Sequence, residues 1–242
     1  MTPSLQEVAL TFDAEKHRYF LGNAEIPSVT AVTGIISKGD GLLQWAVNCA
    51  LGAVKEAMRP GKSLDEVQID RLLNDARFAH RRTVGDAANV GKIVHAWVEA
   101  RIKAILGLGK AKARPVNEAA NVGIESFLAW EEAHSVDYVG SERRVCSREH
   151  LYAGTLDILA RVNGELAIVD IKTSKSVYPE YHLQTAAYQA AYEEEAGEKV
   201  AKRLILHLDK ATGKPKEIPA DGEGDLPAFL AARQLYRRLR GK

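Results

Sequence analysis

The sequence feature that most constrains the fold is the dipeptide Asn163-Gly164, which lies between two apolar segments within residues 151–188. Asn-Gly between strand-like segments is typical of a two-residue β-hairpin loop, because a type I′ turn requires positive φ at both central residues. Counting outward from the turn places Val162 opposite Glu165 and fixes every later pair. We therefore predict strands near residues 153–161 and 166–173, joined as a hairpin.

The same register brings acidic side chains together in strands whose composition predicts burial. It places Leu159 opposite Ile168 and Asp157 opposite Asp170, and Lys172 follows on the same face as Asp170. Opposed carboxylates repel each other, and burying an unpaired carboxylate is costly. A divalent cation between them would remove the conflict, so we predict a metal-dependent phosphodiesterase site. The alternative is a hairpin that exposes both carboxylates and pairs Lys172 in a salt bridge.

Composition sets wide limits on the class of protein. The chain has 242 residues, 46% of them hydrophobic, which predicts a sizeable core in one large or two small domains. The formal net charge of +1 still allows a nucleic-acid partner, because basic grooves can offset an acidic centre. Cys49 and Cys146 lack C-x-x-C spacing, which argues against a cysteine-built zinc or iron–sulfur site. With no secretory signal pattern or membrane-length apolar run, we expect a soluble cytoplasmic protein.

The other segments predict an α/β (α+β) chain with a mixed sheet. Ser63 with Glu66, and Thr83 with Asp86, fit capping boxes that begin helices. Two short strands are predicted within residues 8–29, and residues 209–215 form a connector. Further helices are predicted near 42–59, 84–106, 117–133, 179–195 and 226–240, and further strands near 137–146 and 200–208. We expect residues 1–83 to form an N-terminal hairpin and helical region packing on a core at 84–242, which ends in a helix.

Three motifs resemble those of the PD-(D/E)XK nuclease superfamily, and in particular its RecB-like exonuclease branch. They are Gly-Thr-Leu-Asp at 154–157, Asp-Ile-Lys-Thr at 170–173 and Gln-Thr-Ala-Ala-Tyr at 184–188. The resemblance covers about residues 85–210 and implies a restriction-endonuclease-like αβββαβ core with a helical N-terminal extension. Iron–sulfur members of the branch use four cysteines, which this chain lacks. The resemblance is therefore to phage or CRISPR-associated RecB-like nucleases without a cluster.

The resemblance also implies roles for residues on the flanking helices. Gln184 and Tyr188 are one helical turn apart, so they share a helix face. That spacing fits a surface pair equally well, but the family places this face beside the active site. His95 matches the position of a metal-ligating histidine on an upstream helix, and Glu99 shares its face. The alternative for His95 is a structural or solvated histidine.

On the strand before the hairpin, Glu142 is a further candidate metal ligand, because the family places an acidic residue there. Its alternative is a solvated edge residue. The backbone carbonyl of Ile171 is a ligand by the same resemblance. Arg143, Arg144 and Thr173 are candidate contacts to nucleic acid, although neighbouring strand residues such as Arg143 and Arg144 point to opposite faces.

The expected activity is hydrolysis of DNA by a Mg²⁺- or Mn²⁺-dependent exonuclease acting in recombination, repair or phage DNA processing. Asp157, Asp170, Lys172, Gln184 and Tyr188 are the expected catalytic residues. DNA is the expected partner, together with a possible recombination protein, in the cytoplasm of a bacterial or phage-infected cell. The alternatives are a structure-specific endonuclease or nickase, a non-catalytic nucleic-acid-binding subunit, and a domain that a metal stabilises without nuclease activity.

Overall fold

A computed structural model describes residues 8–36, 40–58, 63–210 and 212–240. Residues 1–7, on which the expectation about a signal sequence partly rests, lie outside the described residues. The chain divides into two compact units. One comprises Met1–Ile36 and Ile93–Lys242, and the other comprises Ser37–Lys92. The sequence-based division at residues 83 and 84 stays a prediction.

The first unit is built on a five-stranded sheet, which is mixed as the sequence predicts. Its strand order is β4-β5-β6-β7-β8, and all neighbours are antiparallel except β6 and β7. The parallel pair is joined through helix α6, the connection that parallel strands require. The strands are β4 (Val136–Ser147), β5 (Tyr152–Val162), β6 (Glu165–Lys172), β7 (Lys202–Leu208) and β8 (Pro215–Pro219).

The turn between β5 and β6 has the predicted geometry. Asn163 and Gly164 have φ values of 52° and 86°. The predicted pairs of Val162 with Glu165 and of Leu159 with Ile168 are confirmed. The paired register ends at Ile158 and Val169, one position before the two aspartates.

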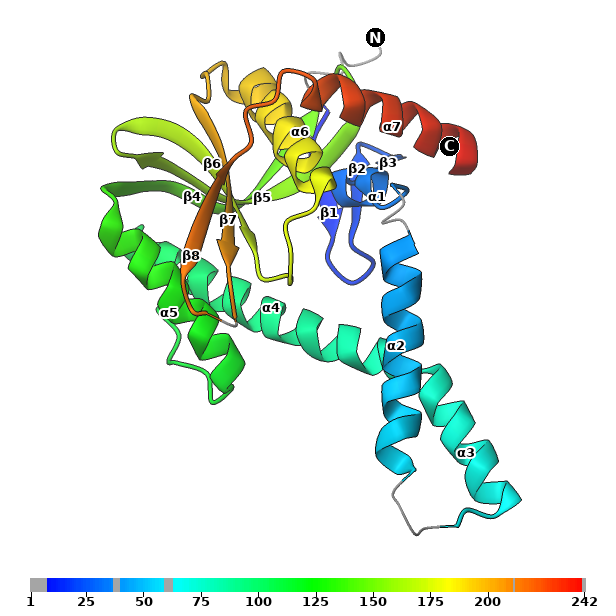
Figure 1. Cartoon of the computed structure of the whole chain (residues 1–242). Coiled ribbons are helices and arrows are strands. Elements are labelled where there is room, and N and C mark those ends of the chain that lie inside the picture. The colour runs from blue at the N-terminus through cyan, green and yellow to red at the C-terminus, as the bar shows by residue number, and fades with distance from the viewer. Residues whose placement is uncertain (1–7, 37–39, 59–62, 211, 241–242) are drawn as a thin grey trace. The chain divides into compact units, whose positions relative to one another are not determined.

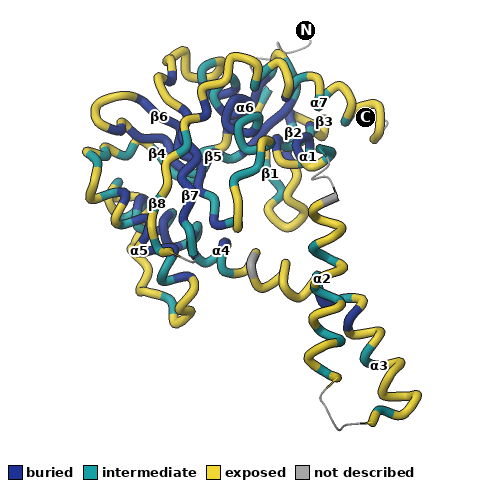
Figure 2. The backbone as a smooth tube through the Cα atoms, viewed as in Figure 1, coloured by how far each residue is buried: buried dark blue, intermediate teal, exposed yellow. Residues whose placement is uncertain are grey.

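Helices α6 (Pro179–Ala196) and α7 (Asp225–Arg240) pack together, and α6 packs on β4 to β7 (Figure 1). Helix α6 has Pro179 at its first turn and ends at Gly197, whose φ of 65° suits a helix C-cap. Buried side chains from β4 to β6 and α6 form the main core, and the buried backbone in Figure 2 follows these elements. Helix α5 (Glu118–Ala133) contacts β7 and β8.

The N-terminal segment forms three short strands where the sequence predicts two. They are β1 (Leu10–Asp13), β2 (Arg18–Leu21) and β3 (Ala24–Ile26), and helix α1 (Val29–Thr33) follows. Two contacts fasten this segment to β5. The N–H of Ala153 donates to the carbonyl of Pro27 at 3.1 Å, and the hydroxyls of Tyr19 and Thr155 lie 2.7 Å apart.

The helices of the second unit begin at other residues than their predicted caps. Helix α3 (Glu66–Arg77) begins after Asp65, whose carboxylate accepts from the N–H of Gln68 at 2.8 Å in a reciprocal capping box. The predicted box of Ser63 is therefore wrong. Helix α4 (Ala79–Ile105) begins four residues before Thr83, whose hydroxyl donates to the Ala79 carbonyl within the helix, so the Thr83 cap is also wrong. Helix α2 (Asp40–Ala57) precedes both.

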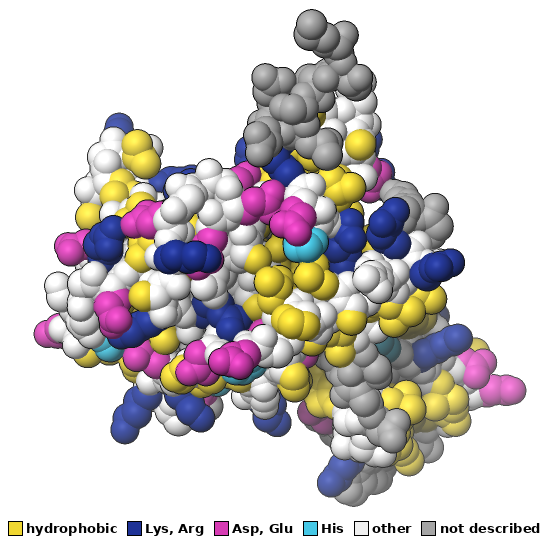
Figure 3. Space-filling view, turned by 90° about the horizontal axis from the view of Figure 1, so that it is seen from above, with side chains coloured by type: hydrophobic (Ala, Val, Ile, Leu, Met, Phe, Trp, Pro, Cys, Tyr) yellow, Lys and Arg dark blue, Asp and Glu magenta, His cyan; other side chains and the backbone are white. Residues whose placement is uncertain are grey.

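Strand β8 begins at Pro215, the last residue of the predicted connector, and has no counterpart among the predicted elements. Proline stands at both of its ends, a residue usually confined to edge strands and strand starts. No helix in the described part of the chain is long and apolar enough to cross a membrane. On the face shown in Figure 3, basic side chains are interspersed with acidic ones.

Candidate active site

Three potential metal-binding side chains meet near the middle of β5. His95 comes from α4, Glu142 from β4 and Asp157 from β5. One ligand atom from each lies within 4.8 Å of the others. His95 Nδ1 is 3.4 Å from Asp157 Oδ1. All three residues belong to the first unit, because its part of α4 starts at Ile93.

An unusual backbone conformation places Glu142 in this cluster. Its φ is 50°, in the left-handed region that non-glycine residues seldom occupy. The neighbouring pairs of Ser141 with Ile158 and Arg143 with Leu156 bracket Glu142 and Asp157 as the intervening positions of the two strands. Strained residues of this kind are common at active and binding sites, where the surrounding structure holds them.

The Asp157 carboxylate is held from two directions. Its Oδ2 accepts the backbone N–H of Ile171 at 2.8 Å, and its Oδ1 faces His95. A carboxylate on β5 thus bonds to the backbone of β6 just where the regular pairing of the two strands has ended. This arrangement fixes the orientation of Asp157 before any ligand binds. This contact involves the N–H of Ile171 and does not test its carbonyl, so the Ile171 carbonyl stays a predicted metal ligand.

Asp170 and Lys172 form a close ion pair beside the cluster. Lys172 Nζ is 2.6 Å from Asp170 Oδ2, and the Asp170 side chain is 1% exposed. The ammonium also lies 4.7 Å from the centre of the Tyr181 ring on α6. The sequence analysis did not select Tyr181, although it shares a helix face with Gln184 and Tyr188 by its spacing of three and seven residues.

The site combines buried groups of opposite charge, which shift one another's pKa values. Burial, reinforced by the charge of Asp157, raises the pKa of Glu142 to about 7. Burial also raises the pKa of Asp170 to about 6, although Lys172 opposes this. For Asp157, burial acts upward, but the charge and hydrogen bond of His95 outweigh it and hold the pKa below its ordinary value. One carboxyl of the site thus favours the ionised form, whereas two others resist it.

Gln184 and Tyr188 form a buried wall of the same region rather than a surface pair. Gln184 Nε2 donates to the Tyr188 hydroxyl at 2.8 Å. Burial, followed by the charge of Asp170, raises the pKa of Tyr188 well above its ordinary value. A Cβ at Gly154 would lie 2.5 Å from the Tyr188 ring. Glycine at this position therefore permits the close approach of α6 to β5.

The remaining candidate residues lie at several places around this centre. Arg143 stacks over the Tyr192 ring of α6 at 4.7 Å, whereas Arg144 stacks over the Phe12 ring of β1 at 4.8 Å. Thr173, directly after β6, is 9% exposed. Glu99 pairs with Lys103, one turn farther along α4, at 2.5 Å.

The donor set suits a divalent cation. Two carboxylates and one imidazole offer the oxygen atoms that Mg²⁺ and Mn²⁺ prefer and a nitrogen that Mn²⁺ readily accepts. Three potential ligands from three separate elements converge here. A third carboxylate, that of Asp170, lies close enough to raise the pKa of His95 by its charge. The arrangement can hold a cation beside the Lys172 ammonium.

Comparison with known proteins gives one informative match. None of the curated proteins searched matches this chain significantly. A solved structure titled "Crystal structure of SSO0001" matches at 12% identity, covering 86% of this chain and 89% of that chain, with a TM-score of 0.36, which is too low to support an argument. A family model described as the PD-(D/E)XK nuclease superfamily matches residues 67–241. Since this match spans well over half of the 242 residues, the chain belongs to the PD-(D/E)XK nuclease superfamily.

Proposed function

We propose that this chain is a DNA exonuclease that depends on Mg²⁺ or Mn²⁺. The observation that carries the proposal is the convergence of His95, Glu142 and Asp157 within 4.8 Å. In this assignment these three residues bind the cation, and Asp170 and the Ile171 carbonyl complete the site. A bound divalent cation would make a water molecule more acidic and neutralise charge on the scissile phosphate.

Lys172 is the proposed electrostatic catalyst. Burial lowers its pKa, but Asp170 and Asp157 outweigh this and raise it, so the side chain stays an ammonium. Asp170 and the Tyr181 ring hold that ammonium in place. A fixed positive charge in a buried site stabilises the negative charge that develops on the phosphate, and it needs no reorganisation during the reaction. Lys172 can also orient the attacking water.

The other residues position these groups. Asp157 is oriented by the N–H of Ile171, and the Gln184–Tyr188 pair forms the wall behind Asp170. Arg144 and Thr173 are proposed to contact the DNA backbone. Arg143, the other arginine expected to contact nucleic acid, lies over the Tyr192 ring, and its proposed role is to stabilise the packing of α6 on β4.

Exonuclease action and a role in recombination, repair or phage DNA processing are proposed from the RecB-like resemblance of the motifs. The family match supports nuclease activity more broadly. The deciding experiment is a time course on 5′- and 3′-labelled linear DNA, single- and double-stranded, and on closed circular DNA, with Mg²⁺, Mn²⁺ or EDTA.

We expect metal-dependent loss of linear DNA from its ends and resistance of closed circles. Cleavage of closed circles would replace the exonuclease by an endonuclease. Asp157→Asn should be inactive, whereas Glu165→Gln, in an exposed ion pair at the far end of the same hairpin, should match the wild type. If the wild type cleaves no nucleic acid but is stabilised by the metal, the proposed activity is wrong.

A further inference from the structure

The loop of the β1–β2 hairpin ends at a histidine with an unusual backbone conformation. The loop joins Asp13 at the end of β1 to Arg18 at the start of β2. Its last residue, His17, is exposed and has a φ of 51°. This left-handed conformation is uncommon for residues other than glycine, and glycine or asparagine adopts it with less strain. Because strained residues cluster at binding and active sites, the exposed His17 ring is a candidate contact surface.

The His17 ring belongs to a cluster of aromatic side chains that also holds an arginine. It meets the Phe12 ring edge-on, with 5.2 Å between the ring centres, and the Tyr19 ring at 6.1 Å. The Arg144 guanidinium of β4 lies over the same Phe12 ring at 4.8 Å. The His17 ring and the Arg144 guanidinium are therefore at most 10 Å apart, which is the sum of their distances to the Phe12 ring.

This cluster lies beside the candidate active site, within the same unit. The Tyr19 hydroxyl is 2.7 Å from that of Thr155. Thr155 is two residues before Asp157 on β5, which corresponds to about 7 Å of strand. Burial is the main cause that raises the pKa of Tyr19, and the charges of Arg144 and Glu142 also act on it. The hairpin is thus adjacent to two of the proposed metal ligands.

The side chains of this surface favour a contact to both the bases and the backbone of a single strand. Glu15 and Lys16, in the same loop, are exposed and carry opposite charges, so the loop has little net attraction for phosphate. A guanidinium stacked on a ring keeps its N–H donors at its edge, where they can bind a phosphate. Aromatic rings beside basic groups are the combination that binds single-stranded nucleic acid, because bases stack on the rings.

We propose that the β1–β2 hairpin binds a single strand of the substrate next to the active site, with a base stacked on His17 and a phosphate on Arg144. A span of at most 10 Å corresponds to about three stacked nucleotides at about 3.4 Å each, so one short stretch reaches both groups. In a duplex the bases stack on one another, and their faces are closed to His17. The proposal rests on the proposed function in taking DNA as the substrate.

The first test measures DNA binding without cleavage. The full chain in EDTA is titrated into a labelled single strand of about twenty nucleotides and into the duplex of the same sequence. His17→Asn should weaken binding of the single strand about tenfold, the loss expected when one base loses its aromatic partner. Binding of the duplex should not change. Asparagine accepts a left-handed φ, so the turn is kept, and urea unfolding verifies the fold of the variant.

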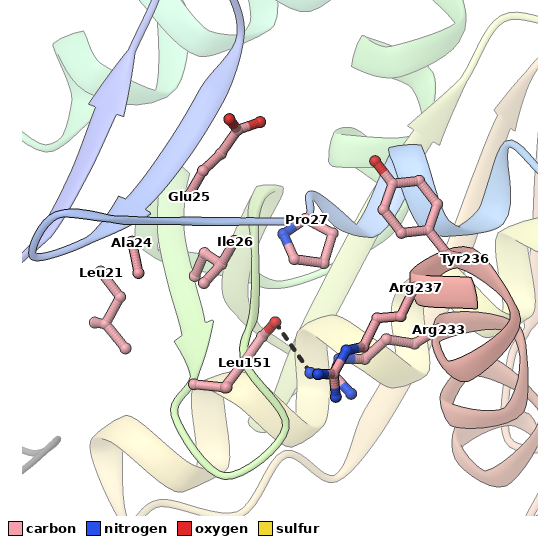
Figure 4. Close-up of a pocket in the computed structure, with 9 residues that line it drawn as sticks. All are labelled: Leu21, Ala24, Glu25, Ile26, Pro27, Leu151, Arg233, Tyr236 and Arg237. Atoms are coloured by element: carbon pink, nitrogen blue, oxygen red, sulfur yellow. Dashed lines mark hydrogen bonds between the residues drawn. The ribbon is translucent and has the colours of Figure 1, made fainter. Parts of the chain in front are cut away.

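His150→Asn is the matched control. The His150 ring also stacks on a tyrosine, Tyr152, at 6.5 Å, but it lies in the turn between β4 and β5. Leu151 of this turn lines a pocket of about 260 Å³ with β3 and α7, shown in Figure 4, which also includes Leu21 at the far end of β2 from the hairpin loop. The control should bind both DNAs as the wild type does. Unchanged affinity of His17→Asn for the single strand, an equal loss on the duplex, or an equal loss in His150→Asn would each overturn the proposal.

The second test uses a strand in which every base is replaced by an abasic site, which keeps the phosphates and removes the stacking partner. The wild type should bind this strand at least about tenfold more weakly than the normal strand. The wild type and His17→Asn should bind it equally, because the interaction that His17 makes is already lost. A persisting difference between the two proteins would overturn the stacking. Equal affinity of the wild type for both strands would also overturn it, even if His17→Asn failed to fold.

Cleavage assays separate this inference from the proposed function. In Mn²⁺, at DNA concentrations below KM, His17→Asn should cleave the single strand about tenfold more slowly than the wild type. A wild-type rate in this variant would contradict the role of the hairpin. If the wild type cleaves no nucleic acid, the proposed function fails, whereas the binding results in EDTA still decide whether the hairpin binds a single strand.

Discussion

The two ends of the β5–β6 hairpin differ in how their strands are joined. At the turn, Asn163 and Gly164 adopt positive φ, and regular pairing continues to Ile158 and Val169. We call the turn the closed end, and we call the end beyond Ile158 and Val169, where regular pairing has stopped, the open end. At the open end, the Asp157 carboxylate accepts a hydrogen bond from the N–H of Ile171. The closed end thus depends on backbone conformation, whereas the open end depends on charged side chains from several elements. The difference indicates that the turn sets the register, whereas the candidate active site lies at the open end.

The largest expected effect comes from removing the positive charge at the open end. Lys172→Met should lower the cleavage rate by about 10²–10³-fold or more, the usual loss when one fixed electrostatic group is removed. Glu165→Gln at the closed end should change it little, because its ion pair with Lys202 is exposed. Initial rates on end-labelled DNA measure both. Comparable losses in the two variants would show that the hairpin acts as one structural unit, without a division between its ends.

The second prediction concerns the pH dependence of stability, which follows from the repulsion between the carboxylates of Glu142 and Asp157. Burial, reinforced by Asp157, raises the pKa of Glu142 to about 7. Between the unfolded value of 4.5 and about 7, the folded state binds more protons, so in EDTA its stability should fall as pH rises through this window. The loss at this one residue should be about 1–3 kcal/mol.

Glu142→Gln removes the titrating group and should flatten this pH profile. In urea unfolding at pH 8 with EDTA, the variant should be more stable than the wild type. Mn²⁺ should reverse the order, because saturation at about 100 times Kd adds about 2.7 kcal/mol to a protein that binds it. If the free energy of unfolding of the two proteins in EDTA changes in parallel with pH, Glu142 is not destabilised by burial and by the charge of Asp157.

A pair of glycine substitutions compares the ends directly. Gly154→Ala places a Cβ 2.5 Å from the Tyr188 ring and should cost about 1–3 kcal/mol, the usual penalty of overpacking. It should also reduce cleavage, because it displaces the wall that Tyr188 forms with Gln184. Gly164→Ala meets no atom within 4 Å, but its φ of 86° is strained for alanine and should cost about 1–2 kcal/mol.

Urea unfolding and cleavage rates should therefore separate the two variants. Both should lose stability, but Gly164→Ala should keep its activity under conditions where it is folded. Normal activity in Gly154→Ala would mean that Tyr188 serves packing alone.

The closed end was predictable from sequence because its determinants are local. Asn163 and Gly164 specify a turn within two residues, and the pairing follows by counting. The same count places Asp157 and Asp170 opposite each other, one position beyond the last regular pair of Ile158 and Val169. In the structure, Lys172 Nζ lies 2.6 Å from Asp170 Oδ2. The assigned roles of these residues stay predictions.

The details of the open end were not predictable because they depend on elements far apart in the chain. The positive φ of Glu142 has no local sequence signal, since non-glycine residues seldom adopt it. Tyr181 beneath Lys172 follows from the packing of α6 on the sheet. The earlier start of α4 also shows that a capping pattern such as that at Thr83 can lie inside a longer helix.

The smallest predicted effect tests which of two neighbouring arginines contacts DNA in the proposed function. Arg143 and Arg144 occupy neighbouring positions of β4, opposite Leu156 and Thr155, and stack on different aromatic rings. Arg144→Ala should weaken DNA binding severalfold, about 1 kcal/mol, and lower its salt dependence. Arg143→Ala should instead cost about 0.5–2 kcal/mol of folding stability through its lost stacking, with DNA affinity unchanged. Fluorescence anisotropy and urea unfolding of both variants measure these effects. Since each substitution removes one positive charge, net charge alone would weaken binding equally, and only a difference between the two variants supports a DNA-facing Arg144.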